Sequence, residues 1–394
     1  MVLKNRLKPA LAKLNPGIPV SAIDLAVDAI IADKSTKSPM DANREIYEML
    51  KNGVKVQIQN QAGKFESRNI AIIDWNTPEN NDFLLVSQMW ILGDLYQRRP
   101  DLIGFVNGIP LLLVELKAPN KNLFDAYNDN LRDYKDTIPQ IFWYNAGIII
   151  SNGLESRIGT ISSGFEHFAQ WKKAAGEDEP SKTNLETMIV GVCEKSRFLD
   201  IVENFILFDS SKGKTVKILG KYHQYHGVNR AIENFSNRKA NGGKIGVFWH
   251  TQGSGKSFSM MFFSAKILRK MPGNYTFVIV TDRDELDKQI YKGFVDGHIT
   301  AEKNSQATSI EHLRKLLSED HRFVFSLIHK FQFKNLAGPI NLRDDIIVMT
   351  DEAHRTQYGE LSMNMRLALP NASFLGFTGT PLIAEETERT KEVF

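Results

Sequence analysis

A phosphate-binding loop constrains the fold of this chain more than any other feature. An apolar run at residues 245–249 leads into HTQGSGKS, residues 250–257, and the helix-like run FSMMFFSAKILRK follows. In such a strand, glycine-rich loop and helix, backbone N–H groups and the positive end of the helix dipole face one anion. His250 stands where the common pattern GxxxxGK[ST] begins with glycine, but the residues expected to touch phosphate are present. The segment therefore predicts a nucleotide-binding α/β domain.

The loop also indicates which residues contact the nucleotide. Its glycines let the backbone bend around the phosphates. Lys256 is expected to reach the β- and γ-phosphates, and the hydroxyl of Ser257 is expected to bind Mg²⁺. The residues expected to hold the nucleotide here are Gly253, Ser254, Gly255, Lys256 and Ser257.

Short apolar runs alternate with helix-like segments through the second half, at residues 276–280, 323–327, 346–349 and 373–377. Such alternation predicts a parallel sheet flanked by helices. The run at 346–349 leads into DEAH, which places an acidic pair at the carboxyl end of a strand, where ligands bind in such sheets. Asp351 is expected to hold Mg²⁺ and Glu352 to orient the attacking water. Acidic pairs also cap helices, but a spacing of roughly 100 residues from the phosphate-binding loop favours an NTPase core.

A second pattern of charged residues lies in the first half. Pro100-Asp101 precedes one apolar run, and Glu115-Leu116-Lys117 ends the next, so the pattern is PD...ExK. Two carboxylates converging on Mg²⁺ let the cation polarise a phosphodiester. Lys117 is expected to project from the same face as Glu115 and to act on the hydrolytic water. A solvated strand edge is the other interpretation of this pattern.

Strand register sets a condition on this site. If Asn107-Gly108 formed a simple two-residue turn between regular strands, Asp101 would oppose Val114 and face away from Glu115. A three-residue loop or one bulge would place Asp101 opposite Glu115. The metal site therefore requires an irregular hairpin.

The remaining patterns divide the chain into two regions. The polar stretch DSSKGKTVK, residues 209–217, indicates the main boundary, and we expect domains at residues 1–212 and 213–394. In the first region, periodicity predicts helices at 22–30 and 45–50, hairpins from 54–58 with 70–75 and from 102–106 with 111–116, a strand at 147–150 and a surface loop at 176–184.

Composition excludes several classes of protein. The chain of 394 residues is 42% hydrophobic and 24% charged, which is typical of a globular protein with a real core. Lys plus Arg is 49 against 46 for Asp plus Glu, and this excess neither demands nor excludes nucleic acid. The apolar runs fall short of the ~20 residues of a membrane helix, and no signal-peptide block opens the chain. Cys193 is the one cysteine, which excludes an internal disulfide. We expect a cytoplasmic protein without membrane contact.

Three segments resemble the ordered motifs of superfamily 2 helicases and translocases: DEAH, FTGTP at 377–381 and TDRDELDKQ at 281–289. The resemblance implies that Gln224, in KYHQYHGVNRA, reads the adenine edge of ATP. It also implies that Thr378 and Thr380 couple the nucleotide state to DNA contacts. A surface amide on a helix is the other interpretation of Gln224.

The same resemblance implies two RecA-like domains with ATP between them and arginine fingers on the second. The chain stops at Phe394, shortly after the last motif of the first such domain. We therefore expect a fragment of a longer protein that binds ATP with Mg²⁺ but turns it over poorly.

The stretch NNDFLLVSQMWILGDLYQRRPDLIGFVNGIPLLLVELKAP, with YKDTIPQIFWYN and GIIISNG after it, resembles the nuclease domain of the motor/restriction (R) subunit of type I restriction endonucleases. The resemblance implies a PD-(D/E)xK-type mixed-sheet nuclease domain followed by a RecA-like parallel-sheet P-loop domain. The related nucleases carry a helix motif QxxxY, and the matching positions are Asn130 and Tyr134, where asparagine is shorter by one methylene. Glu45 matches an additional acidic residue near the metal, although a solvated helix charge explains it as well.

The leading hypothesis is therefore an ATP- and Mg²⁺-dependent double-stranded DNA translocase and endonuclease. By resemblance, its partners are the methyltransferase and specificity subunits that recognise the DNA site. The alternative is a repair nuclease-helicase that acts on DNA ends without such partners. A third interpretation, a DNA-binding scaffold with decayed sites, is disfavoured because Asp101, Glu115, Lys117, Lys256, Asp351 and Glu352 are all present.

Overall fold

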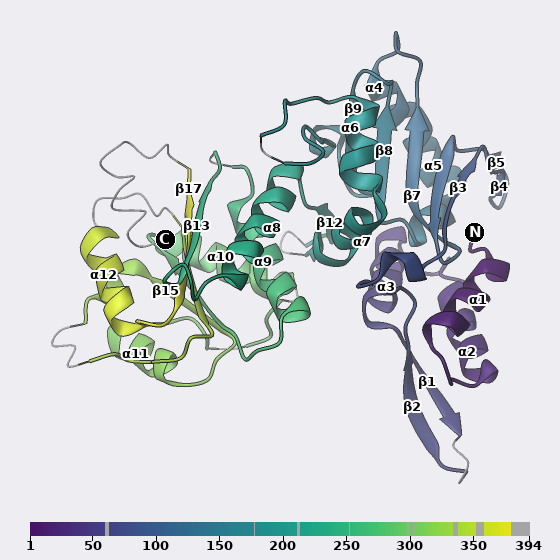
Figure 1. Ribbon diagram of the computed structural model, residues 1–394. Coiled ribbons are helices and arrows are strands. Elements are labelled where there is room, and N and C mark those ends of the chain that lie inside the picture. The colour runs from purple at the N-terminus through teal and green to yellow at the C-terminus, as the bar shows by residue number, and fades with distance from the viewer. Residues whose placement is uncertain are drawn as a thin grey trace. The chain divides into compact units, whose positions relative to one another are not determined.

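The computed structural model describes residues 1–394 except 60–62, 177, 211–212, 252, 298, 303, 334–337, 352–357 and 380–394, and the side chains of 358–360 and 362. The chain forms two compact units (Figure 1). The first unit is Met1–Phe208 with Thr215–Tyr222, and the second unit is Asp209–Lys214 with His223–Phe394.

Three helices open the first unit: α1 (Lys4–Leu14), α2 (Val20–Ile31) and α3 (Pro39–Asn52). The sequence fixes the ends of α3. The hydroxyl of Ser38 accepts a hydrogen bond from the N–H of Asp41, and Pro39 occupies the first turn, where its missing N–H costs nothing. Gly53, with φ +79°, ends the helix. The two helices predicted from periodicity are confirmed.

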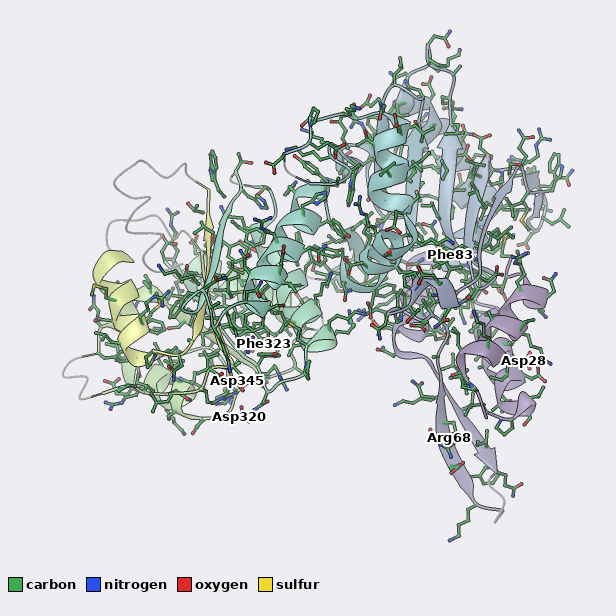
Figure 2. The ribbon with its side chains drawn as sticks, viewed as in Figure 1. Asp28, Arg68, Phe83, Asp320, Phe323 and Asp345 are labelled. Atoms are coloured by element: carbon green, nitrogen blue, oxygen red, sulfur yellow. The ribbon has the colours of Figure 1, made fainter. Side chains whose placement is uncertain are left out.

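A two-stranded ribbon of β1 (Val54–Gln59) and β2 (Phe65–Ile70) extends from these helices (Figure 1), and Arg68 lies on it (Figure 2). The prediction that residues 70–75 form the second strand was wrong, because Val54 pairs with Ile70 and the strand runs back from there. Ile72 and Ile73, the apolar residues that suggested a strand, are instead buried in a loop. The side chains of Asn15 and Asn107 hydrogen-bond the loop backbone in place of a strand.

A mixed six-stranded sheet forms the centre of the first unit, in the order β10-β9-β8-β7-β6-β3. Strands β7 and β8 are parallel and the other neighbours are antiparallel. The predicted second hairpin and the strand at 147–150 are confirmed. The strands are β3 (Phe83–Ser87), β6 (Leu102–Val106), β7 (Ile109–Leu116), β8 (Gly147–Ser151), β9 (Ser156–Gly159) and β10 (Ala169–Gln170), with a small pair β4 (Ile91–Leu92) and β5 (Gln97–Arg98).

Helices of the first unit complete the core on the sheet. They are η1 (Pro78–Asn80), α4 (Leu123–Asp125), η2 (Ala126–Leu131), α5 (Arg132–Thr137), η3 (Pro139–Trp143), η4 (Phe165–His167), α6 (Leu185–Met188), η5 (Ile189–Cys193) and α7 (Lys195–Asn204). Residues from β6, β7, β8, η2 and α5 share one buried cluster.

The polar stretch at 209–217 lies within a hairpin of β11 (Ile206–Asp209) and β12 (Val216–Leu219). β12 belongs to the first unit, where the ammonium of Lys217 donates to the side-chain oxygen of Asn43 and the carbonyl of Asn145. The ammonium lies over the neighbouring rings of Tyr47 and Phe208, and burial lowers the pKa of Lys217 to about 7. Lys217 therefore ties β12 to the first unit just before helix α8 (Tyr222–Ser236) begins. The assignment of separate functions to residues 1–212 and 213–394 stays a prediction.

The second unit is built on a five-stranded, fully parallel sheet in the order β13-β17-β16-β14-β15. The strands are β13 (Lys244–Trp249), β14 (Thr276–Thr281), β15 (Phe323–Leu327), β16 (Ile346–Asp351) and β17 (Ser373–Thr378). The helices are α8 (Tyr222–Ser236), α9 (Lys256–Lys270), α10 (Asp284–Asp296), α11 (Ile310–Ser318), η6 (Ile328–Phe331) and α12 (Tyr358–Ala368). All the predicted strands of this half are confirmed, and with them the predicted α/β class.

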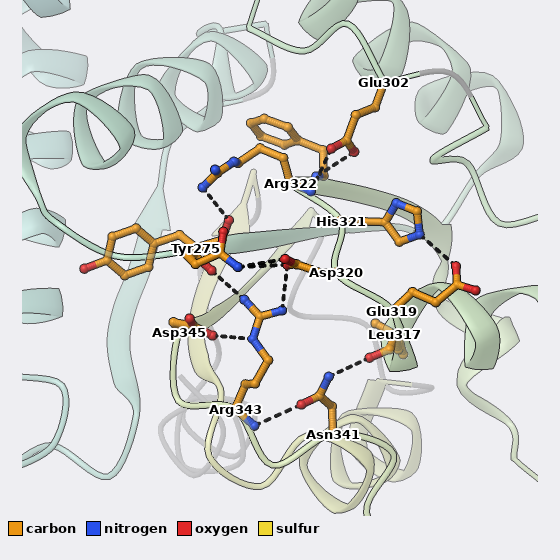
Figure 3. Close-up of polar contacts among 12 residues, drawn as sticks. Tyr275, Glu302, Leu317, Glu319, Asp320, His321, Arg322, Asn341, Arg343 and Asp345 are labelled. Carbon is orange, nitrogen blue, oxygen red and sulfur yellow. Dashed lines mark hydrogen bonds and ion pairs between the residues drawn. The ribbon is translucent and has the colours of Figure 1, made fainter.

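The two edges of this parallel sheet differ. In the core, Phe323 of β15 (Figure 2) stacks on Phe277 of β14. At the amino ends of the strands, the guanidinium of Arg343 bonds Asp345, Asp320 and the carbonyl of Asn274 (Figure 3). This network lines a small pocket at the amino edge, whereas ligands of such parallel sheets bind at the carboxyl edge. Across the described ranges, no helix is both long and apolar enough to cross a bilayer.

Candidate functional site

The hairpin of β6 and β7 contains the irregularity that the metal site requires. Val106 pairs with Ile109 across a two-residue turn, in which Asn107 and Gly108 have φ of +51° and +77°. The register then shifts, so that Gly104 pairs with Leu112 and Leu102 with Val114. Leu111 is the extra residue, and the bulge places Asp101 opposite Glu115.

Gly104 makes room for this bulge. A Cβ added to Gly104 would lie 3.1 Å from the Cβ of Leu112. Directly opposed Cβ atoms are usually about 4.5–5.5 Å apart, so the two strands approach unusually closely here. Only glycine fits this register shift without moving its neighbour.

Each of the opposed carboxylates accepts a hydrogen bond from a backbone N–H of the facing segment. One oxygen of Asp101 accepts from the N–H of Leu116 at 2.8 Å, and Glu115 accepts from the N–H of Asp101 at 3.3 Å. β7 and β8 are paired in parallel here, and the N–H of Lys117 extends the ladder to the carbonyl of Ser151. The two carboxylates therefore converge at the carboxyl end of β7.

The side chain of Asn130 bridges Glu115 and Lys117. Its amide nitrogen donates to Glu115 at 2.9 Å, and its oxygen accepts from the ammonium of Lys117 at 2.6 Å. Asn130 lies in η2, a π-helical turn, and Tyr134 follows four positions later on α5, beside Glu115 and Asn130. π-Turns recur at functional sites because they displace side chains from the regular helical positions. The shorter asparagine thus reaches the site, and nothing in the residue pattern signalled the π-turn.

Burial and charge perturb this cluster. Glu115 is 1% exposed, and burial is the largest cause that raises its pKa from the ordinary 4.5 to about 7. The negative charge of Asp101 is the second cause, and the N–H of Asp101, Tyr134 and Lys117 act in the opposite direction. Burial and the charge of Glu115 also raise the pKa of Tyr134. Two carboxylates pressed together in this way favour a cation between them.

The donor set fits Mg²⁺. This ion is commonly bound through one or two carboxylates, with water and substrate phosphate oxygens supplying the remaining ligands. In the part of the chain that the structure describes, no group of three or more His, Cys, Asp and Glu is placed to hold a metal. Asp101 and Glu115 would therefore hold the ion as a pair.

Glu45 is engaged elsewhere. Its carboxylate bonds Lys34 at 3.1 Å and also Lys37, and these partners lower its pKa. Among the described residues, none of its contacts reaches Asp101, Glu115 or Lys117. The metal role expected of Glu45 stays a prediction without a supporting contact.

The phosphate-binding loop connects β13 to α9, whose first residues are Lys256 and Ser257. Gly253 and Gly255 have φ of +79° and +88°, which a side chain would strain. Lys256, the first residue of α9, is buried, and Ser254 in the preceding loop is half-buried. The expected residues of the loop are thus brought into one bend.

Gln224 of α8 packs against this loop. It is 3% exposed, and its amide nitrogen donates to the carbonyl of Gly255 at 2.9 Å. The sequence reasoning gave no role to the preceding His223. His223 contacts the carbonyl of Ser254 at 3.3 Å, and its ring lies 4.7 Å from that of His250. Burial, then the charges of His223 and Lys256, lower the pKa of His250 to about 4, so its ring is neutral at pH 7.

The carboxyl ends of three strands meet beside the loop. Trp249 of β13 pairs with Thr378 of β17, and Asp351 of β16 pairs with Phe377 of β17. The N–H of His250 donates to the carbonyl of Thr378 at 3.0 Å. Asp351 and Thr378 are therefore at the same sheet edge as the loop. Glu352 and Thr380 lie outside the described residues.

Two family models match the chain. Residues 1–167 match the type I restriction enzyme R protein N terminus, and residues 223–394 match the SWI2/SNF2 ATPase family. The candidate metal site lies in the first match and the phosphate-binding loop in the second.

Curated relatives match across both units. The endonuclease subunit of the HindI type I restriction enzyme of Haemophilus influenzae is 37% identical over 100% of this chain and 40% of its own length. A putative type I restriction enzyme endonuclease subunit, MjaIXP, of Methanocaldococcus jannaschii is 32% identical over 97% of this chain and 39% of its own length. The chain thus spans about two-fifths of these relatives.

Among solved structures, the UvsW helicase of bacteriophage T4 is similar at 16% identity, covering 51% of this chain and 65% of that chain, with a TM-score of 0.36. This score is below the level at which two folds are taken to be the same.

Proposed function

Because the chain belongs to the family of type I restriction enzyme endonuclease subunits, we propose that its first unit cuts DNA and its second unit binds ATP to power DNA translocation. The observation that carries the nuclease proposal is the convergence of Asp101 and Glu115 across the bulge, with Lys117 held two residues along the strand. A solvated strand edge would not bury Glu115 or pair it with an amide and a tyrosine.

In the proposed reaction, Asp101 and Glu115 hold Mg²⁺ at the end of β7. When bound, this ion polarises the phosphodiester and stabilises the charge that develops on its oxygens. Lys117 orients the attacking water and takes part in its deprotonation. Asn130 keeps the ammonium of Lys117 beside Glu115, and Tyr134 holds Glu115 from the helix side. Because the pKa of Glu115 is raised, ion binding near pH 7 displaces a proton from this carboxyl.

In the second unit, we propose that Gly253, Ser254 and Gly255 cradle the phosphates, while Lys256 neutralises their charge. Ser257 and Asp351 hold Mg²⁺, and Glu352 orients the water that attacks the γ-phosphate. Gln224 reads the adenine, with Thr378 and Thr380 coupling nucleotide state to DNA. The backbone bond from His250 to Thr378 offers a direct path for that coupling.

The whole enzyme carries these reactions, together with double-stranded DNA and the methyltransferase and specificity subunits that recognise the site. We place it in the cytoplasm, where DNA and ATP are both available. The shared sequence with curated endonuclease subunits supports this assignment over a repair nuclease that works on DNA ends.

The test uses the complete protein, assembled with its partners. Asp101→Asn should reduce DNA cleavage at least about 1,000-fold, because losing a metal ligand removes several kcal/mol of transition-state stabilisation. ATP hydrolysis should stay within twofold. Asp28→Asn, an exposed aspartate on α2 (Figure 2), is the matched control and should change neither activity.

The companion variant is Lys256→Ala, which should abolish ATP binding and the cleavage that depends on translocation. If Asp101→Asn cuts DNA normally, the nuclease proposal fails. Cleavage of DNA ends that needs neither the methyltransferase nor the specificity subunit would instead favour the repair enzyme.

A further inference from the structure

A short hairpin arm leads directly into the candidate metal site. We define the arm as residues 88–101, between β3 and β6, with β4 and β5 as its strands (Figure 1). Its base is closed by a hydrogen bond from the N–H of Gln88 to the carbonyl of Asp101, at 2.9 Å. Its turn is closed by a bond from the N–H of Gly93 to the carbonyl of Tyr96, at 2.7 Å. The base of the arm therefore lies beside Asp101.

One face of the arm is fixed to the body of the first unit. Ile91 is buried in the core, and Arg98 makes two hydrogen bonds to Asp133 of α5, at 2.5 and 2.8 Å. The side-chain amide of Gln140 donates to the carbonyl of Leu92 at 2.6 Å. At Gly93, an added Cβ would lie 2.0 Å from the carbonyl oxygen of Thr137, so only glycine allows this close approach. The arm is therefore a rigid element.

The arm also exposes large apolar side chains. Leu95, at the tip, is 86% exposed, and three further residues of the arm are more than half exposed: Trp90, Leu92 and Tyr96. Scattered apolar residues are normal on protein surfaces, but four exposed ones within seven residues of one short hairpin indicate an interaction site.

The arm exposes one cation, Arg99, near its base and one carboxylate, Asp94, at its tip, and the cation indicates which partner fits. The guanidinium of Arg99 lies 5.2 Å from the ring centre of Trp90, and Arg99 is exposed. Over the described residues, Arg99 makes no ion pair, whereas Arg98 is neutralised by Asp133. A cation beside aromatic and aliphatic surfaces matches a phosphate backbone with sugars and base faces next to it. Continuity with a site built to cut phosphodiesters points to the same partner.

We propose that the arm grips the DNA duplex beside the scissile phosphate, with Arg99 on a backbone phosphate and the tip, Leu95 and Tyr96, against the sugars and base edges of the groove. This inference rests on the proposed nuclease function. The five steps along the chain from Tyr96 to Asp101 span at most about 17 Å, at about 3.3 Å per residue, which corresponds to about five base pairs. The arm therefore holds the DNA within about five base pairs of the cut.

Photo-cross-linking identifies the partner of the tip directly. The photoreactive residue p-benzoylphenylalanine replaces Leu95 in the complete protein, assembled with its partner subunits, duplex DNA and ATP. Irradiation should join position 95 to DNA. The same replacement at Val20, a 64% exposed apolar residue on α2, is the matched control and should give no DNA adduct. Adducts from position 95 to protein alone, or no adduct, would overturn the proposal.

Cleavage kinetics give a second readout. Leu95→Ser combined with Tyr96→Ser should slow cleavage about tenfold, while ATP hydrolysis stays within twofold and Val20→Ser has no effect. Arg99→Ala should lower the slope of log cleavage efficiency against log salt by about 1, because one phosphate contact is lost. An unchanged rate in the tip variant together with an unchanged salt slope in Arg99→Ala would refute the role of the arm.

The two proposals fail separately. If Asp101→Asn still cuts DNA while position 95 cross-links to DNA, the nuclease assignment is wrong and the arm stands. If Asp101→Asn is inactive and position 95 does not cross-link to DNA, the arm proposal alone is wrong.

Discussion

In the second unit, most of the residues expected to hold a nucleotide follow one another along the chain, whereas the candidate metal site takes its residues from two strands and a helix. Residues 253–257 make one bend between β13 and α9, and regular parallel strands bring Asp351 to the same edge. In the first unit, Asp101 meets Glu115 because Leu111 is bulged, and Asn130 reaches both Glu115 and Lys117 from a π-turn.

The difference shows that the two sites depend on different kinds of order. A contiguous loop keeps its geometry wherever a strand and a helix flank it. A site assembled across a hairpin depends on one irregular position, and a slip of one residue would turn Asp101 to the other face. The metal site should therefore be the more fragile of the two.

The largest expected effect is the loss of DNA cleavage when a substitution disrupts the bulge between β6 and β7. Gly104→Val places branched carbons where a Cβ already lies 3.1 Å from Leu112, so the strands must separate or change register. A misplacement of about 1 Å can cost about 100-fold in rate, and a register change should reduce DNA cleavage at least about 1,000-fold. ATP binding by the second unit should be unchanged, as measured by nucleotide titration of the complete protein.

Alanine at two glycines gives the control for this variant. Gly104→Ala should reduce cleavage, whereas Gly147→Ala on the neighbouring β8 should not, because its added Cβ meets Ile158 at an ordinary 3.6 Å. Full cleavage by Gly104→Val would show that the bulge does not position Asp101.

The next largest effect is the change in stability with pH that follows from the protonation of Glu115. The unfolded chain releases the proton of Glu115 near its ordinary pKa of 4.5, and the folded chain near 7. The folded state thus holds the proton more tightly, so the metal-free protein loses stability as pH rises from 4.5 to 7, by on the order of 2 kcal/mol. Glu115→Gln should therefore be more stable than the unmodified protein at pH 8 and equal to it at pH 4.

Urea unfolding in the presence of a chelator measures this difference. Adding Mg²⁺ should stabilise the unmodified protein at pH 8 but not Glu115→Gln, because the cation needs the second carboxylate. A variant that is less stable than the unmodified protein at pH 8 without metal would contradict the raised pKa.

The smallest expected effect concerns Gln224, which packs against the phosphate-binding loop. Gln224→Ala should weaken ATP binding about tenfold and reduce the preference for ATP over GTP, because an amide can both donate to and accept from the adenine edge. Gln57→Ala, on the exposed face of β1, is the control. Equal weakening of ATP and GTP would instead show that Gln224 acts by holding the carbonyl of Gly255, the bond seen in this structure.

The sequence by itself determined the parallel sheet of the second unit, its strands and the bend of the phosphate-binding loop. These features depend on short-range patterns: apolar runs, glycines with positive φ and the residues that flank them. The sequence also identified Asp101, Glu115 and Lys117 as candidate residues of a metal site. The strand register required an irregular hairpin between Asp101 and Glu115.

Tertiary structure alone decided how that irregularity arises, that Asn130 lies in a π-turn, and that Glu45 pairs with Lys34 and Lys37. It also decided that residues 71–75 form a loop in which Ile72 and Ile73 are buried, because apolar residues satisfy burial equally well in a loop whose backbone bonds Asn15 and Asn107. Register and side-chain pairing depend on residues far apart in the chain, where energy differences of about 1 kcal/mol choose between alternatives. No local pattern carries that information.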